Sequence, residues 1–180
     1  MAGKEEYAGI VSLLAPHKTD SERNTTLMNA ATNSHAKTIE VIVGHDYGFG
    51  DSHGRTALMI AAQEGNLETL RALIEYEKGL KDNNGCTALV HAARVGHRDV
   101  AKLLIIHEKD AAGWTMPMYT AALEDTDMVS QRLDEKDQRD KQGQTALIIT
   151  AQNGRGETVK LLMKHENGVS GWTGLIYCVS

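Results

Sequence analysis

The feature that most constrains the fold of this chain is a ten-residue stretch that recurs along its length. Its clearest copy, residues 56–65, reads Thr-Ala-Leu-Met-Ile-Ala-Ala-Gln-Glu-Gly. Further copies, complete, weakened or shortened, begin at Thr25, Thr87, Thr115, Thr145 and Thr173. The six threonines are therefore 31, 31, 28, 30 and 28 residues apart. Self-similarity at a nearly fixed period of this size predicts a solenoid, in which each repeat is one small unit stacked on the next.

The repeat that begins at Thr56 shows the expected elements most clearly. We expect a first helix whose start is capped by the Thr56 hydroxyl, which can accept an unpaired amide of the first turn. Gly65 should end this helix in the left-handed conformation that glycine adopts most readily. The inner face of the helix is predicted from three residues at i, i+3 and i+4 spacing, which are Leu58, Ala61 and Ala62.

A second helix is predicted after Gly65, because Leu70, Leu73 and Ile74 form a stripe at helical spacing. The polar residues 81–85 that follow are typical of a hairpin-type turn. One such helix pair cannot bury its apolar face alone, whereas stacked pairs bury a continuous core. The sequence therefore predicts an all-α solenoid of helix-turn-helix units joined by short β-hairpin-like loops.

The whole chain, residues 1–180, is interpreted as one domain of such repeats. Its parts are an N-terminal half repeat at 1–24, repeats at 25–55, 56–86, 87–114, 115–144 and 145–172, and a truncated repeat at 173–180. The exits of the third and fifth repeats are short, which we interpret as a stunted hairpin. In the fourth repeat, Pro117 stands in place of the core Leu and Asp125 in place of the turn Gly. We therefore expect the fourth repeat to be the least stable.

Charge and composition exclude several classes of function. The net charge is −5 and both signs are interspersed without a basic block, which argues against a nucleic-acid or anionic-membrane surface. No apolar run approaches the ~20 residues of a membrane helix, and no apolar signal core opens the sequence. The two cysteines lie in repeats whose siblings have none at those places, so a reducing compartment is favoured. We expect a cytoplasmic protein, with the nucleus as the alternative.

Motifs for catalysis, cofactors or metals have simpler interpretations in this chain. The residues His97-Arg98-Asp99 spell the start of a kinase catalytic loop, but the accompanying kinase motifs are absent, so we predict a turn followed by the start of a helix. His45, His107 and His165 each follow a second-helix stripe, which favours helix-end histidines over a zinc site. We therefore predict no catalytic residues, no metal, no cofactor and no small-molecule substrate.

The repeat resembles the ankyrin repeat, whose hallmark is Thr-Pro-Leu-His-x-Ala at a period of about 33 residues. The matching features here are Thr-Ala-Leu-Met-x-Ala-Ala, the Gly or Gly-His turn, and the connector pattern Asp-x-x-Gly-x-Thr at residues 51–56 and 82–87. The family's Pro and its His after Leu are both replaced, so these repeats should be held more by packing than by the family's hydrogen bonds. The Thr-Ala-Leu-Met variant is similar to certain protist ankyrin proteins, some of which carry the array behind a NIMA-related kinase domain.

The resemblance implies a protein partner, held on a concave face by hairpin tips and by exposed residues near the ends of the first helices. Carried onto this chain, the partner-binding residues are Ser52, His53, Arg55, Gln63, Glu64, Asn83, Asn84, Cys86, Arg94, Val95, Trp114, Leu123, Lys141, Gln142, Gln144, Gln152 and Asn153. These residues vary between repeats while the core letters stay fixed, which fits either a surface that reads a partner or plain tolerance of solvent-facing positions. Trp114, like Trp172, either anchors a partner or folds over its shortened connector to cover the next repeat.

Three hypotheses of function follow. The first is a non-catalytic adaptor or scaffold that binds a protein. The second is a regulatory or targeting part of a kinase system, and the third is a purely structural cytoskeletal spacer.

Overall fold

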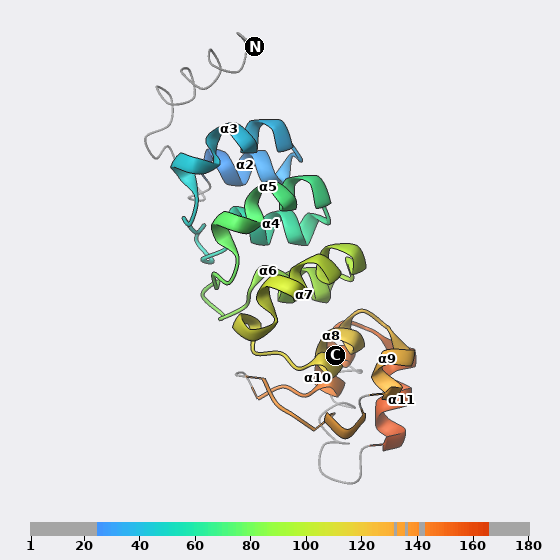
Figure 1. Ribbon diagram of the computed structural model, residues 1–180. Helices are drawn as coiled ribbons and strands as arrows, with labels where there is room; N and C mark the ends of the chain where they lie inside the picture. Colours follow the sequence, from blue (N-terminus) through green and yellow to red (C-terminus); the bar gives the residue numbers. More distant parts are fainter. Residues whose placement is uncertain (1–24, 132, 136, 141–142, 166–180) are drawn as a thin grey trace. The chain divides into compact units, whose positions relative to one another are not determined.

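The computed structural model describes residues 25–131, 133–135, 137–140 and 143–165 (Figure 1). The predicted half repeat before residue 25 and the truncated repeat after residue 172 lie outside these ranges. The chain divides into two compact units, with unit 1 holding described residues up to 92 and 99–112, and unit 2 holding 93–98 and those from 113 onward. In the described part of the chain every regular element is a helix, as the all-α prediction requires.

Unit 1 contains successive helix pairs in which the second helix is longer than the first. The pairs are α2 (Thr26–Thr32) with α3 (Ala36–Asp46), α4 (Ala57–Glu64) with α5 (Leu67–Glu77), and most of α6 (Ala88–Val95) with most of α7 (Arg98–Ala112). Helix α2 packs against α3 and α4, while α5 packs against α3 and α4 (Figure 1). First helices thus neighbour first helices, and second helices neighbour second helices.

Unit 2 follows the same plan with shorter elements. It contains α8 (Met116–Ala122), α9 (Thr126–Gln131), the short 3-10 helix η1 (Leu133–Glu135), α10 (Ala146–Gln152) and α11 (Gly156–His165). Helix α8 packs against α9 and α10, and α11 packs against the same two helices. The layering of unit 1 is therefore repeated within unit 2.

The predicted core letters are buried. The leucine two residues after the repeat threonine is fully buried in four repeats, as Leu27, Leu58, Leu89 and Leu147. The second-helix stripe is buried at Ile39, Ile42, Val43, Leu70, Leu73, Ile74, Val100, Leu104, Val129, Val159 and Leu162. Leu103 of α7 and Leu161 of α11, and Leu133 of η1, are only partly buried.

The turn between the helices of each pair uses the left-handed conformation nine residues after the threonine. Gly65 has φ of 76°, as predicted, and Gly96 and Gly154 behave alike. In the two weaker repeats the position is taken by Ser34 at φ 60° and Glu124 at φ 56°. The prediction that Asp125 replaces the turn glycine is therefore wrong by one residue.

Pro117 begins a helix instead of disrupting one. It lies in the first turn of α8, where the backbone amide of any residue would lack a helical partner. Its side chain is buried. Pro117 is thus compatible with the fold. Its effect is that the first turn of α8 lacks one backbone amide donor.

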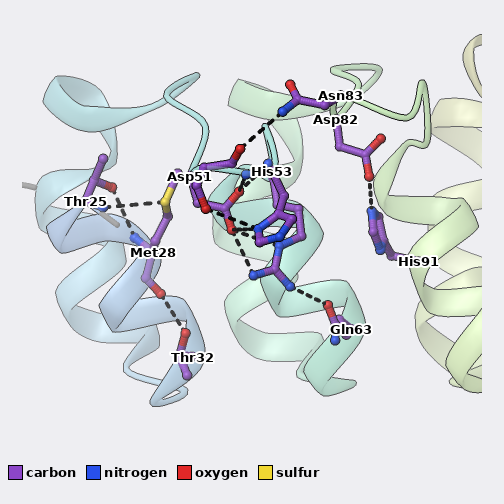
Figure 2. Close-up of polar contacts among 11 residues, drawn as sticks. Thr25, Met28, Thr32, Asp51, His53, Gln63, Asp82, Asn83 and His91 are labelled. Atoms are coloured by element: carbon purple, nitrogen blue, oxygen red, sulfur yellow. Dashed lines mark hydrogen bonds and ion pairs between the residues drawn. The ribbon is translucent and has the colours of Figure 1, made fainter. Parts of the chain in front are cut away.

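Thr56 is the N-cap residue of α4, as predicted, but the expected capping bond of its hydroxyl is wrong, because its side chain makes no capping hydrogen bond. The amide of Leu58 donates instead to Oε2 of Glu77, at 2.7 Å, from the far end of the second helix. Oε1 of Glu77 accepts the amide of Gly48 from the preceding connector, at 2.9 Å. Thr25 does follow the expected pattern, accepting the amide of Met28 at 3.3 Å (Figure 2).

The same carboxylate bridge, defined as a second-helix acid that accepts the amide two residues after the repeat threonine, recurs in unit 1. Glu108 accepts the amides of Leu89 at 2.8 Å and Gly79 at 2.9 Å. Asp46 accepts the amide of Leu27 at 3.2 Å. The acceptor for a first-turn amide is therefore a side chain nineteen residues away. No local sequence pattern predicts this contact.

The short exit of the third repeat contains a longer helix and no hairpin. Helix α7 has 15 residues and ends at Gly113, whose φ is 72°. The expectation of a stunted hairpin is therefore wrong at this position, because the helix fills the connector. Trp114 follows directly and packs on Tyr119 of the next first helix, with ring centroids 5.3 Å apart.

Candidate functional site

The candidate site is built on tip turns, the connectors whose pattern is Asp-x-x-Gly-x-Thr. In the first, the amide of Gly54 donates to the carbonyl of Asp51, and the amide of Asp51 donates to the carbonyl of Arg55. Oδ1 of Asp51 accepts the amides of His53 and Arg55, each at 2.8 Å. The aspartate thus folds the turn around its own buried carboxylate and leaves the middle of the turn facing solvent.

The guanidinium of Arg55 holds this tip turn to the end of its first helix. Its Nε and Nη2 each lie 2.8 Å from Oδ2 of Asp51, and its Nη1 donates to Oε1 of Gln63 at 3.2 Å. Burial acts to raise the pKa of Asp51, but the amide and guanidinium donors outweigh it and lower that pKa below its ordinary value. Arg55 and Gln63, predicted separately, are therefore one preorganised pair.

The second tip turn uses a different partner for the same carboxylate. Oδ1 of Asp82 accepts the amides of Asn84 and Cys86, each at 2.9 Å. Cys86 stands where Arg55 stands in the sibling, so it offers no guanidinium. His91, on the first helix, instead places Nε2 2.9 Å from Oδ2 of Asp82 (Figure 2). His91 belongs to the site and was missed, because its partner lies across a turn.

A third tip turn includes residues 140 and 143–145. Lys141, Gln142 and Gln144 were predicted as tip residues here, although the full Asp-x-x-Gly-x-Thr pattern was not recognised. The amide of Gly143 donates to the carbonyl of Asp140, and the amide of Gln144 donates to its Oδ1 at 2.8 Å. Nε2 of Gln144 reaches Oε1 of Gln152 at 3.2 Å. This pair repeats the relation of Arg55 to Gln63 eight residues apart, and the full pattern was present in the sequence as Asp-Lys-Gln-Gly-Gln-Thr.

Neighbouring tip turns contact one another in unit 1. The amide of Asn83 donates to the carbonyl of His53 at 3.0 Å, and its Nδ2 donates to the carbonyl of Ser52 at 3.3 Å (Figure 2). Gly54 has φ of 77°, and a Cβ there would collide with the side chain and amide of Asn83. Successive tips are therefore fixed relative to one another through Asn83.

The predicted partner-binding residues differ in exposure. Those with exposed side chains are Ser52, His53, Glu64, Asn83, Asn84, Val95 and Gln152, and those partly exposed are Arg55, Gln63, Arg94, Gln144 and Asn153. Lys141 and Gln142 lie outside the described residues. Cys86, Trp114 and Leu123 are at most 7% exposed. These three offer little surface to a partner in the free chain.

Trp114 is buried within unit 2. Besides Tyr119, it contacts Arg94, whose guanidinium carbon lies 6.0 Å from the indole centroid. An aromatic face near a guanidinium is a cation–π arrangement. Of the two roles expected for Trp114, this packing favours covering the next repeat.

A second polar edge in unit 2 was not predicted. Arg155 places Nη1 3.8 Å from Oε2 of Glu124 and Nη2 3.4 Å from the carbonyl of Val95. Arg98 donates to the carbonyl of Glu124 at 3.4 Å. The repeat pattern could have indicated these contacts only if Glu124 had been recognised as the residue in the left-handed position between the two helices of the fourth repeat.

The groups at these tips can donate and accept hydrogen bonds. The tips present amides, hydroxyls, an imidazole and a held guanidinium. In the ranges that the structure describes, no three His, Cys, Asp or Glu side chains are grouped to hold a metal ion. His97 precedes α7, which begins at Arg98, so these residues form a turn and a helix start as predicted.

None of the described helices is both long enough and apolar enough to span a bilayer.

The stacked helix pairs and their tip turns define the class as an α-helical repeat solenoid. The family model for ankyrin repeats (3 copies) matches residues 27–113 and 117–180. The chain therefore belongs to the ankyrin repeat family. A search of curated proteins found no match to this chain.

Proposed function

We propose that this chain is a non-catalytic protein-binding module, an adaptor or scaffold that holds a partner with its tip turns and the ends of its first helices. Ankyrin repeats are generic protein–protein interaction modules, and the family is typically non-catalytic. The observation that carries the proposal is the split between constant and variable positions. The constant leucines are fully buried, whereas the tip residues that differ between repeats, such as His53 and Asn84, are exposed.

The way the tips are held supports this proposal. Arg55 is fixed by Asp51 and Gln63, and Asn83 is fixed on the neighbouring tip. Side chains that are ordered before binding lose less conformational freedom when a partner docks. Exposed polar groups on a rigid scaffold therefore favour a specific protein surface over a spacer without a preferred face.

The test is affinity capture with paired charge-reversal variants. Glu64→Lys changes an exposed residue at the end of the first helix α4, and Glu40→Lys changes an exposed residue on the second helix α3. We expect Glu64→Lys, combined with Asn84→Ala, to reduce partner recovery at least tenfold, since a few contacts carry most binding energy. Asn84→Ala keeps the backbone amide that bonds Asp82, so the turn stays intact.

The matched control, Glu40→Lys combined with Thr38→Ala on α3, should recover the partner as the unaltered chain does. Circular dichroism verifies that both double variants are folded. Equal recovery by the two variants would contradict the proposed face, and uniform tolerance of both would support the structural spacer instead.

A second candidate is a regulatory or targeting part of a kinase system. It is favoured by the Thr-Ala-Leu-Met repeat variant, which resembles protist ankyrin proteins and the arrays behind NIMA-related kinase domains. Capture of a protein kinase by the tip face, lost in Glu64→Lys with Asn84→Ala, would select this candidate. We also propose a cytoplasmic location, with the nucleus as alternative, and a protein partner in preference to nucleic acid, membrane or small molecule. Fluorescent tagging of the chain in its own cells tests the location.

A further inference from the structure

The carboxylate bridges of unit 1 obey a fixed register. In the second repeat the acid, Glu77, stands 21 residues after Thr56, and its amide donor is Leu58. The same 21-residue distance separates Thr87 from Glu108, and Thr25 from Asp46. The position is always acidic in unit 1, and the donor is always the leucine two residues after the threonine.

Two of these acids also join one repeat to the one before it. Glu77 accepts the amide of Gly48, which belongs to the preceding connector, and Glu108 accepts the amide of Gly79 in the same way. Glu77 and Glu108 are each 1% exposed. The two glycine amides are only partly buried, but a buried carboxylate that loses its donors retains its desolvation penalty. These bonds therefore couple adjacent repeats of unit 1 energetically.

The fourth repeat lacks both halves of this bond. The residue 21 positions after Thr115 is Lys136, which has no acceptor, and the residue two positions after it is Pro117, which has no amide hydrogen. The fifth repeat keeps an acid at this register in its sequence, Glu166, so the departure belongs to the fourth repeat. The second helix of the fourth repeat is also short, since α9 has six residues where α3 and α5 have eleven.

We infer that the fourth repeat is a built-in breakpoint, so that the chain unfolds in two steps, with unit 2 unfolding before unit 1. The stability of a solenoid is approximately a sum of repeat terms and nearest-neighbour terms. Unit 1 gains the carboxylate bridges in its neighbour terms, whereas the fourth repeat cannot form the bridge. Paired loss of donor and acceptor leaves no unsatisfied group at this bond, which explains how the repeat folds while contributing less.

The tryptophans of the chain allow the unfolding of unit 2 to be measured separately. It has two tryptophans, of which Trp114 belongs to unit 2 and Trp172 follows it along the chain. Tryptophan fluorescence therefore follows unit 2, while far-ultraviolet circular dichroism follows the helices of both units. In a urea titration, we expect two transitions in the circular-dichroism signal. The fluorescence change should have a lower urea midpoint than the second of these transitions. Coincident single transitions by both probes would overturn the inference.

The role of the bridge is tested with Glu108→Gln, whose side-chain amide has one acceptor oxygen for two amide donors. We expect the later transition to move down by roughly 1 M urea, while the fluorescence midpoint stays in place. The control is Glu75→Gln, which removes an exposed carboxylate paired with Lys78 at the end of α5. A shift no larger than that of the control, or an equal shift of the fluorescence midpoint, would refute the inference.

Hydrogen exchange on the unaltered chain provides an independent measurement that needs no variant. The amides of Leu58 and Leu89 should exchange more slowly than those of α8 and α9. Equal or reversed protection contradicts the breakpoint, whether or not Glu108→Gln folds.

Discussion

At the scale of single residues, the buried acids of unit 1 are the least expected feature of the chain. Desolvation raises the pKa of Glu77 above its ordinary value, against the lowering effect of the Gly48 and Leu58 amides and of Thr56, and nearby Asp46 raises it further. Burial likewise raises the pKa of Glu108, against the Gly79 and Leu89 amides, Thr87 and His107. Both acids therefore bind protons more tightly in the folded chain than in the unfolded chain.

The sign of the pH dependence follows from this difference. Between the unfolded value near 4.5 and the raised folded value, the folded state holds more protons, so stability falls as pH rises through that window. We predict that the difference in unfolding free energy between the unaltered chain and Glu77→Gln decreases as pH rises from about 4.5. Urea titrations at a series of pH values measure it. A difference that stays constant or grows with pH would contradict the prediction.

Comparing two glycines in equivalent tip turns separates the energetic cost of the Asn83 contact from the cost of the left-handed backbone conformation. Gly54 and Gly143 have φ of 77° and 75°, but a Cβ at Gly54 would meet Asn83, whereas one at Gly143 would meet nothing within 4 Å. Gly143→Ala should cost about 1 kcal/mol for the left-handed conformation alone. Gly54→Ala should cost about 1–3 kcal/mol more, because Asn83 must shift. Urea unfolding of both variants measures these two costs. Equal losses of unfolding free energy would contradict the prediction and show that Asn83 shifts without cost.

At the scale of elements, the turn between paired helices sets where each pair folds back. Ser34 adopts φ of 60° where three sibling repeats have glycine, so its backbone is strained there. Ser34→Gly should stabilise the chain by roughly 0.5–1 kcal/mol. The control is Asp125→Gly, which alters the residue after the left-handed position of the fourth repeat and should not stabilise the chain. Thermal unfolding measures both, and a gain with Asp125→Gly but none with Ser34→Gly would contradict the register of these turns.

The helices were predictable from sequence because their signals are local. Leu58, Ala61 and Ala62 lie on one helical face, and Gly65 marks its end, so each first helix could be placed from one repeat and checked against the next. The core was predictable for the same reason. Repetition also showed which positions vary.

The features that were not predicted from sequence depend mostly on contacts between residues far apart in the chain. Glu77 reads as an ordinary polar residue near the end of a helix, yet its partner is 19 residues away. The last turn of α7 replaced a hairpin because residues 107–112 favour helix and Gly113 can end it. His91 and Trp114 find their partners, Asp82 and Tyr119, only after the turns have folded. Local patterns place elements, but they do not specify which distant groups meet.

At the scale of the whole molecule, the chain separates scaffold from surface. The letters that identify the ankyrin repeat family are buried, as Leu58 and Leu89 are, so the identifying motif has little area with which to bind. The surface is supplied by the tip turns and helix ends, whose residues differ from repeat to repeat. Specificity is therefore proposed to lie in the letters that the family motif leaves free.

The most direct measurement of this claim is hydrogen exchange of the chain with and without a captured partner. The proposed function predicts slower exchange on binding at the tip turns, residues 51–55 and 82–86, and at the end of α4, residues 63–64. It predicts no change along α3 and α5, the second helices of unit 1. Protection confined to α3 and α5, with the tip turns unchanged, would contradict the account.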